Sequence, residues 1–262
     1  MLAPLLTHRG YIWRNALAEV RNRYAGSMMG LVWNVLEPLS LILIFTIVFT
    51  RIMSDRGAGL ALEVPYVVYL CSALLPWTAF CEGITHTTHT FTANANYLRK
   101  LALPEHVFVA QSALTTLFGL AVSFTLLVVI SLALGVQPSW RWALLPAPLL
   151  LLVTFAAGIG MGLGTLHVFF RDVGHVVPIF LRIGFWLYPI VYHAEGFLGP
   201  GAARFLPLNP AYPFLESVRV LFIRDEIPGP WLWAGMAAWT LVGVSLGFAI
   251  LRRLRSEMRD VL

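Results

Sequence analysis

The sequence predicts an all-α polytopic membrane protein that forms a single transmembrane domain over residues 1–262. Apolar residues make up 58% of the chain and charged residues only 12%, with a mean hydropathy of +0.77. A soluble protein of this size needs more polar surface to cover itself. At about 20 residues per span, the chain has room for six transmembrane helices with short connections.

Residues 1–28 predict an amphipathic helix that lies at the membrane interface. Trp13, Leu17 and Val20 recur at spacings of three and four, while arginines occupy other faces of the helix. So many charges in so short a segment would be costly in hydrocarbon. An interfacial helix therefore fits this segment better than the first turns of a span.

Six spans are expected next, five of them within residues 29–193. They are predicted near 29–51, 65–90, 107–135, 143–168 and 175–193, and the sixth near 231–251, followed by a tail to 262.

The distribution of Lys and Arg predicts the topology. With the N-terminus inside, the inner side collects Arg9, Arg14, Arg21, Arg23, Arg99, Lys100, Arg171, Arg182, Arg252, Arg253, Arg255 and Arg259. The outer side has Arg51, Arg56, Arg141, Arg204, Arg219 and Arg224. By the positive-inside rule both termini are cytoplasmic, and the net charge of +5 reflects topology rather than binding of nucleic acid.

Residues 194–230 form an apolar segment that glycines and prolines interrupt repeatedly. Neither half is long enough to cross a bilayer. We expect short half-helices that re-enter from the outer surface and are buried by protein; an extracellular loop is the alternative.

The sequence carries no motif for catalysis or for nucleotide binding by a P-loop. The single lysine, Lys100, is followed by Leu101, whereas a P-loop needs Ser or Thr there. The glycine-rich stretch 158–164 lies inside an apolar span and misses the dinucleotide spacing. Its two G-x-x-x-G pairs predict close helix packing.

Several ionisable groups nevertheless fall within the predicted spans. His86 and His89 lie on one helical face, but only Glu82 is near enough to add a ligand, so we expect no metal site. These histidines and the neighbouring threonines are expected to satisfy one another or to line a wet cavity. Glu37, Glu82 and Arg182 should face protein or water.

The two inner connections, residues 94–107 and 169–178, are short and charged. They suit contact with a soluble partner, although positive-inside charge alone would also explain them.

Five stretches, in order along nearly the whole chain, resemble the membrane subunits of ABC-2-type exporters of polysaccharide. "VRNRYAGSMMGLVWNVLEP" resembles the N-terminal signature of that family, carried by Arg21, Arg23, Tyr24, Ser27, Gly30, Trp33 and Pro38. "VPYVVYLCSALLPW", "NYLRKLALP", "HVFFRDVGHVVP" and "LNPAYPFLESVR" resemble the second span, the two inner loops and the outer region of the family.

The resemblance implies a pair of six-helix subunits that works with two separate P-loop ATPase subunits in the bacterial inner membrane. ATP and Mg²⁺ would bind to the ATPase, and no cofactor to this chain. The interface helix would contact lipid headgroups and the ATPase through Arg14, Arg21, Arg23 and Tyr24. The coupling residues would be Asn96, Leu98, Arg99, Lys100, Pro104, Arg171 and Asp172.

The transported molecule would be a cell-surface polysaccharide, commonly lipid-linked, such as O-antigen or capsule. Aromatic rings offer flat faces to sugar C–H groups, so the expected channel residues are Trp77, Phe80, Phe185, Trp186, Tyr188 and Tyr192. The outer gate would contain Asn209, Pro210, Glu216 and Arg219. An ABC-2 exporter of a small molecule and a proton-driven carrier or scaffold without an ATPase are the alternatives.

Overall fold

The computed structural model describes residues 7–23, 25–51, 65–100, 103–191 and 206–262. Its elements in chain order are α2 (Arg9–Asn22), η1 (Gly30–Val32), α3 (Trp33–Arg51), α4 (Tyr66–Ala93), α5 (Ala95–Lys100), α6 (Glu105–Ala133), η3 (Trp140–Leu144), α7 (Pro146–Phe169), α8 (Val173–Leu187), η4 (Leu206–Leu208), α11 (Tyr212–Phe222) and α12 (Pro230–Val261). No strand occurs in these ranges.

Five of the described helices, α3, α4, α6, α7 and α12, are long and apolar enough to cross a membrane. This confirms the predicted all-α polytopic class. The helix at the fifth predicted span, α8, has 15 residues and extends over only about 22 Å.

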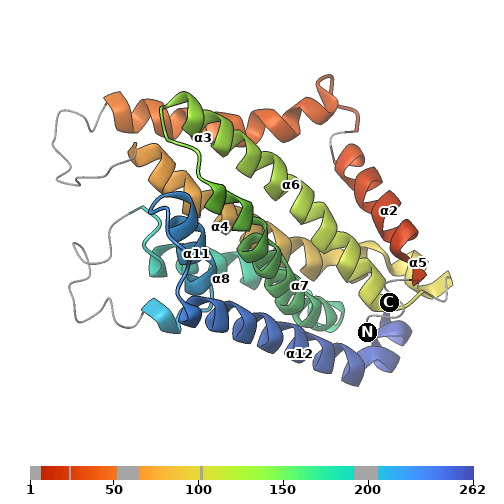
Figure 1. Cartoon of the computed structure of the whole chain (residues 1–262). Coiled ribbons are helices and arrows are strands. Elements are labelled where there is room, and N and C mark those ends of the chain that lie inside the picture. Colours follow the sequence, from red (N-terminus) through yellow and green to blue (C-terminus); the bar gives the residue numbers. More distant parts are fainter. Residues whose placement is uncertain (1–6, 24, 52–64, 101–102, 192–205) are drawn as a thin grey trace.

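Helices α4 and α7 lie at the centre of the bundle and pack against each other (Figure 1). Helix α12 runs along α7, whereas α6 packs on α4 and carries α2 and α3 on its outer side. Most residues of α4 are buried, whereas Ile42 is the only buried residue among the described side chains of α3. The core therefore runs along α4 and α7.

The glycines of α7 allow its two neighbours to approach closely, as the G-x-x-x-G spacing predicts. A Cβ on Gly158 would lie 2.6 Å from the backbone nitrogen of Val244 in α12. A Cβ on Gly160 would lie 2.5 Å from Thr87 Cβ in α4. Neither α12 nor α4 could pack at its present distance from α7 if these two positions carried side chains.

Local sequence explains where two of the helices end. Helix α6 ends before Gly135, whose φ of 88° favours glycine and whose N–H donates to the carbonyl of Leu132. Helix α8 ends at Leu187, not near residue 193 as predicted. Tyr188 is extended because Pro189 follows it, and a residue before proline disfavours the helical conformation.

The described part of the predicted re-entrant region consists of η4 and α11; residues 192–205 lie outside the described residues. Helix α11 has 11 residues, about 16 Å, too short to cross a bilayer. Its residues from Pro213 to Phe222 are buried against α4, α7 and α12. Two features favour the start of α11. A proline occupies its first turn, and Asn209 Oδ1 accepts a hydrogen bond from the N–H of Ala211.

Helix α12 continues through the predicted tail as one helix to Val261. Its C-terminal part, α2 and α5 all lie at one end of the bundle, which we call the α5 end (Figure 1). Residues after Leu251 are rich in helix formers, and Met258 is buried against the core.

Candidate functional site

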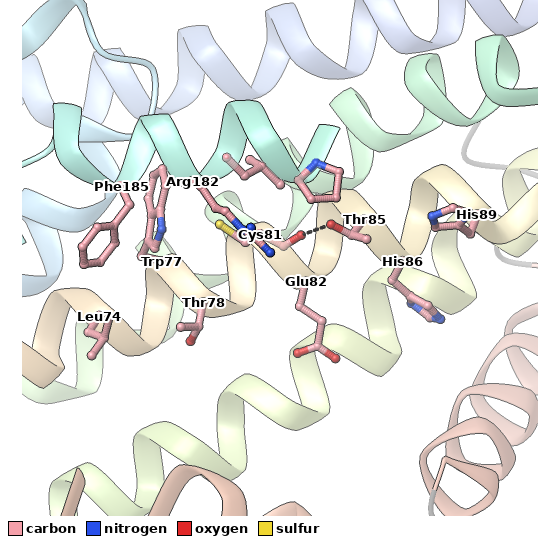
Figure 2. A pocket seen from close by; sticks show the side chains of 12 residues that line it. Leu74, Trp77, Thr78, Cys81, Glu82, Thr85, His86, His89, Arg182 and Phe185 are labelled. Atoms are coloured by element: carbon pink, nitrogen blue, oxygen red, sulfur yellow. Dashed lines mark hydrogen bonds between the residues drawn. The ribbon is translucent and has the colours of Figure 1, made fainter. Parts of the chain in front are cut away.

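Helices α4 and α8 form the two walls of a groove of about 700 Å³ (Figure 2). Most of its wall is apolar and includes the rings of Trp77 and Phe185. The lining residues that can form hydrogen bonds are Thr78, Glu82, Thr85, His86, His89 and Arg182. We call this hollow the α4/α8 groove. His86 and His89, singled out from the sequence, both line it.

A larger hollow of about 1150 Å³ lies on the other side of α8, between α8, α7 and the residues that precede α11. Its lining is almost entirely apolar. Trp77 and Phe80 contribute to it from α4, and Trp186, which is 66% exposed, contributes from α8. Phe80 also stacks on Phe155 of α7, with ring centroids 5.7 Å apart.

The structure thus places four of the six predicted channel residues around α8: Trp77, Phe80, Phe185 and Trp186. Tyr188 lies elsewhere, because it is fully buried beside α11, where its hydroxyl lies 3.5 Å from Glu216 Oε2. Tyr192 is outside the described residues.

Helix α5 presents a charged surface at the α5 end. Asn96, Arg99 and Lys100 are exposed, whereas Leu98 is buried in a cluster with Phe108 and Met258 of α6 and α12. Pro104 precedes the first residue of α6. A single buried side chain thus fixes the short helix while its polar residues remain accessible.

Helix α12 also supports this surface through an ion pair. Arg255 Nε donates a hydrogen bond of 2.9 Å to Glu105 Oε1 at the start of α6, and the carboxylate side chain is 3% exposed. The N-terminus of a helix carries a partial positive charge, which stabilises a carboxylate at this position. The pair fixes the C-terminal part of α12 beside the connection from α5 to α6.

The turn between α7 and α8 carries the second pair of predicted coupling residues, Arg171 and Asp172, both exposed. Close beneath it, the rings of His89 and His167 meet edge to face at 4.7 Å. A Cβ on Gly174 would lie 2.7 Å from His89 Cε1. The turn is therefore in tight contact with the inner part of α4.

Helix α2 is attached to the bundle by polar contacts that the sequence did not reveal. Glu19 accepts hydrogen bonds from Gln111 Nε2 at 3.1 Å and Thr115 Oγ1 at 3.0 Å, both on α6. Its other oxygen lies 2.6 Å from His86 Nε2 on α4. Arg23, just after α2, forms an ion pair with Glu82 of α4.

These contacts affect the titration of Glu19. Burial raises the pKa of this carboxyl, but the hydrogen bond and charge of His86, with the bonds from Gln111 and Thr115, outweigh it. The pKa of Glu19 therefore lies below its ordinary value, and the carboxylate form is favoured.

The remaining predicted interface residues are accessible. Arg14 donates to the carbonyl of Gly10 within α2, and Arg21 is exposed. Tyr24 is outside the described residues. Trp13 and Leu17 are 51% and 40% exposed, and the ring of Trp13 meets that of Phe118 on α6 edge to face at 5.2 Å.

At the opposite end, the four predicted gate residues fall on or just before α11. Asn209 and Pro210 precede the helix. Glu216 forms an ion pair with Arg224 at 2.8 Å, and Arg219 is 3% exposed and donates to two backbone carbonyls after α8. The Arg219 guanidinium also lies 4.1 Å from the ring centroid of Tyr69 on α4.

Three contacts of this site were missed from the sequence: those of Glu19, of Glu82 with Arg23, and of Glu105 with Arg255. One signal was available for the first. Ile12, Ala16 and Glu19 share a helical face, and this is the face of α2 that is buried. Within the described ranges, no group of three or more His, Cys, Asp or Glu side chains is placed to bind a metal ion.

Comparison with known proteins gives the same picture over most of the chain. The ABC-2 type transporter family matches residues 11–223. The O-antigen export system permease protein RfbA of Myxococcus xanthus is 25% identical over 261 residues, which cover 99% of this chain and 98% of that protein. RfbA of Klebsiella pneumoniae is 25% identical over 249 residues (93% of this chain, 92% of that protein). The polysialic acid transport protein KpsM of Escherichia coli is 23% identical over 243 residues (92% of each chain). These matches confirm the resemblance noted in the sequence.

Proposed function

Because the chain belongs to the ABC-2 type transporter family, we propose that it is the membrane subunit of an ATP-driven exporter of a cell-surface polysaccharide. The relatives that support this substrate are named for export of O-antigen and transport of polysialic acid, and they align over almost their whole length. A chain of apolar helices around open grooves suits transport rather than catalysis.

ATP hydrolysis takes place on a separate ATPase subunit, which holds ATP and Mg²⁺. The sequence supports this division because its one lysine is not part of a P-loop. Two copies of the chain pair and work with two ATPase subunits. The protein is placed in the bacterial inner membrane with both termini in the cytoplasm, as the excess of Arg on that side favours.

The observation that carries the coupling role is the arrangement at the α5 end. The exposed Arg99 and Lys100 stand on a helix fixed by the buried Leu98, and the same apolar cluster includes Val168 near the end of α7. Movement of a partner against α5 is thereby passed to α6, α7 and α12. The turn at Arg171 and Asp172 passes it to α8.

Deletion of the gene tests the proposed function. The long-chain glycan of the cell is then followed at the surface and on the lipid carrier inside. Loss from the surface with accumulation inside supports polysaccharide export. Unchanged surface glycan in a strain without a second exporter contradicts it and favours an ABC-2 exporter of a small molecule.

A further inference from the structure

The α4/α8 groove contains an arginine inside the predicted fifth span. Arg182 lies nine residues after Val173, about 14 Å along the axis of α8. Its side chain is exposed on the groove and extends from α8 toward α4 (Figure 2). A guanidinium at this depth costs several kcal/mol in hydrocarbon, so the groove must supply water or an anion.

The other charged groups nearby already have partners. Glu82 pairs with Arg23, and Glu19 with His86, so neither carboxylate compensates Arg182. Among the residues that the structure describes, no carboxylate forms an ion pair with the Arg182 guanidinium. Arg182 therefore presents an uncompensated positive charge to the groove.

The remaining lining suits a polyhydroxylated molecule. The hydroxyls of Thr78 and Thr85 donate to backbone carbonyls of α4, at 2.8 Å each, which leaves their oxygens free to accept from a ligand. At the far end of the groove, Trp77 and Phe185 present aromatic rings. One groove thus combines an anion-binding group, acceptors for hydroxyls and flat apolar surfaces.

We propose that the α4/α8 groove binds an anionic group of the transported molecule, a carboxylate or a phosphate, through the guanidinium of Arg182. Arginine matches the planar geometry of either anion with two parallel hydrogen bonds. The anion can belong to an acidic sugar of the glycan or to the phosphate of its lipid carrier. This inference rests on the proposed export function.

Arg182 lies between the lining of the groove and an exposed stripe of α8, so contact with a second copy of the chain is the outcome that the test must separate from ligand binding. Pro178, Leu181 and Phe185 line the same hollow as Arg182. Ile179 and Trp186, three and four residues from Arg182, are exposed beside it and apolar.

The test uses the full-length chain in nanodiscs of neutral lipid and measures binding of three probes by calorimetry. The probes are a sialic acid hexamer, neutral maltohexaose and farnesyl pyrophosphate. The variants are Arg182→Gln, Arg182→Lys and, as a control that removes the same charge from an exposed site on α12, Arg252→Gln.

We expect Arg182→Gln to weaken binding of one anionic probe about tenfold or more and Arg182→Lys to have an intermediate effect. Binding of maltohexaose should not change, and the Arg252→Gln control should bind all probes as wild type does. Loss for the sialic acid hexamer assigns the anion to the glycan, and loss for farnesyl pyrophosphate assigns it to the lipid carrier. The proposal is wrong if wild-type protein binds neither anionic probe, or if both bind Arg182→Gln and wild type equally. Chemical cross-linking of the same nanodiscs measures the contact between two copies, and the proposal is also wrong if Arg182→Gln lowers the yield of cross-linked dimer but leaves binding of both anionic probes unchanged.

Complementation of the deletion strain distinguishes failure of the proposed export function from failure of the proposed role of Arg182. If deletion leaves surface glycan unchanged, the proposed export function fails. If deletion abolishes export and Arg182→Gln restores it as fully as wild type, only the role of Arg182 fails.

Discussion

Arg219 of α11 donates a hydrogen bond of 2.8 Å from Nη1 to the carbonyl oxygen of Pro189, just after α8. Its Nη2 donates to the next carbonyl, that of Ile190, at 2.9 Å. The backbone here has left the helix, so these carbonyls have lost their helical partners. The buried guanidinium replaces those partners and joins the end of α8 to α11.

Replacing Arg219 should therefore loosen α8 from α11. Arg219→Lys keeps the charge but cannot reach both carbonyls in the same planar geometry, so we expect a loss of roughly 1–3 kcal/mol in stability. Thermal unfolding of the purified protein in detergent measures the change. The exposed Arg253 offers a matched control, since Arg253→Lys should leave the midpoint unchanged. Equal midpoints for Arg219→Lys and wild type would show that the two bonds add nothing.

The attachment of α2 should depend on pH through Glu19. The pKa of this carboxyl is lowered in the folded protein, so its stabilising effect is complete above the ordinary pKa of about 4.3. It is lost as the pH falls through the lower folded value. At pH 7 we expect Glu19→Gln to lower stability by roughly 1 kcal/mol, because weaker acceptors replace the carboxylate.

Unfolding midpoints of wild type and Glu19→Gln, measured from pH 7 down to pH 3.5, check this dependence. The difference should shrink as the pH falls below about 4.3. The exposed Glu257 supplies the control Glu257→Gln, which should follow wild type throughout. A difference that grows as the pH falls below about 4.3 would have the wrong sign for this assignment.

Two glycines offer a direct test of the packing between α7 and α12. A Cβ at Gly158 would meet backbone atoms of α12 at 2.6 Å, whereas one at Gly119 of α6 would meet nothing within 4 Å. We expect Gly158→Ala to destabilise the protein by roughly 1–3 kcal/mol. Gly119→Ala should be neutral or stabilising by up to about 1 kcal/mol, since alanine favours helix. If both variants unfold alike, close packing at Gly158 is not what holds α12.

The positions of the long helices could be predicted from the sequence because hydropathy and span length determine them directly. Hydropathy predicts too late an end for α8, since the apolar run continues past Leu187 while the Tyr188–Pro189 step stops the helix. Hydropathy indicates whether a segment prefers lipid or water, and it carries no information about this local steric restriction.

The contacts of individual side chains were harder to predict. Glu105 and Arg255 lie 150 residues apart, and no local pattern brings them together. Tyr188 belongs to the aromatic run that indicated a channel, yet it points to Glu216 and Arg219, because the chain leaves the helix at that residue. Which face of a helix lines a groove depends on the neighbouring helices. The sequence gives little indication of that face, because the sides that meet lipid and the sides that meet protein are both apolar.

The coupling role of α5 gives the last prediction. Arg99 and Lys100 are exposed and contribute little to folding, so the double variant Arg99→Glu, Lys100→Glu should fold normally. Opposite charge at a surface that meets the ATPase should reduce glycan export about tenfold or more while ATP hydrolysis continues. The control reverses two exposed charges of α12 at the same end, Arg252→Glu and Arg253→Glu. Export is measured in the deletion strain and hydrolysis in membranes from the same cells. Unchanged export in the α5 variant would contradict the coupling assignment, and equal losses in both variants would point to the overall charge of the α5 end instead.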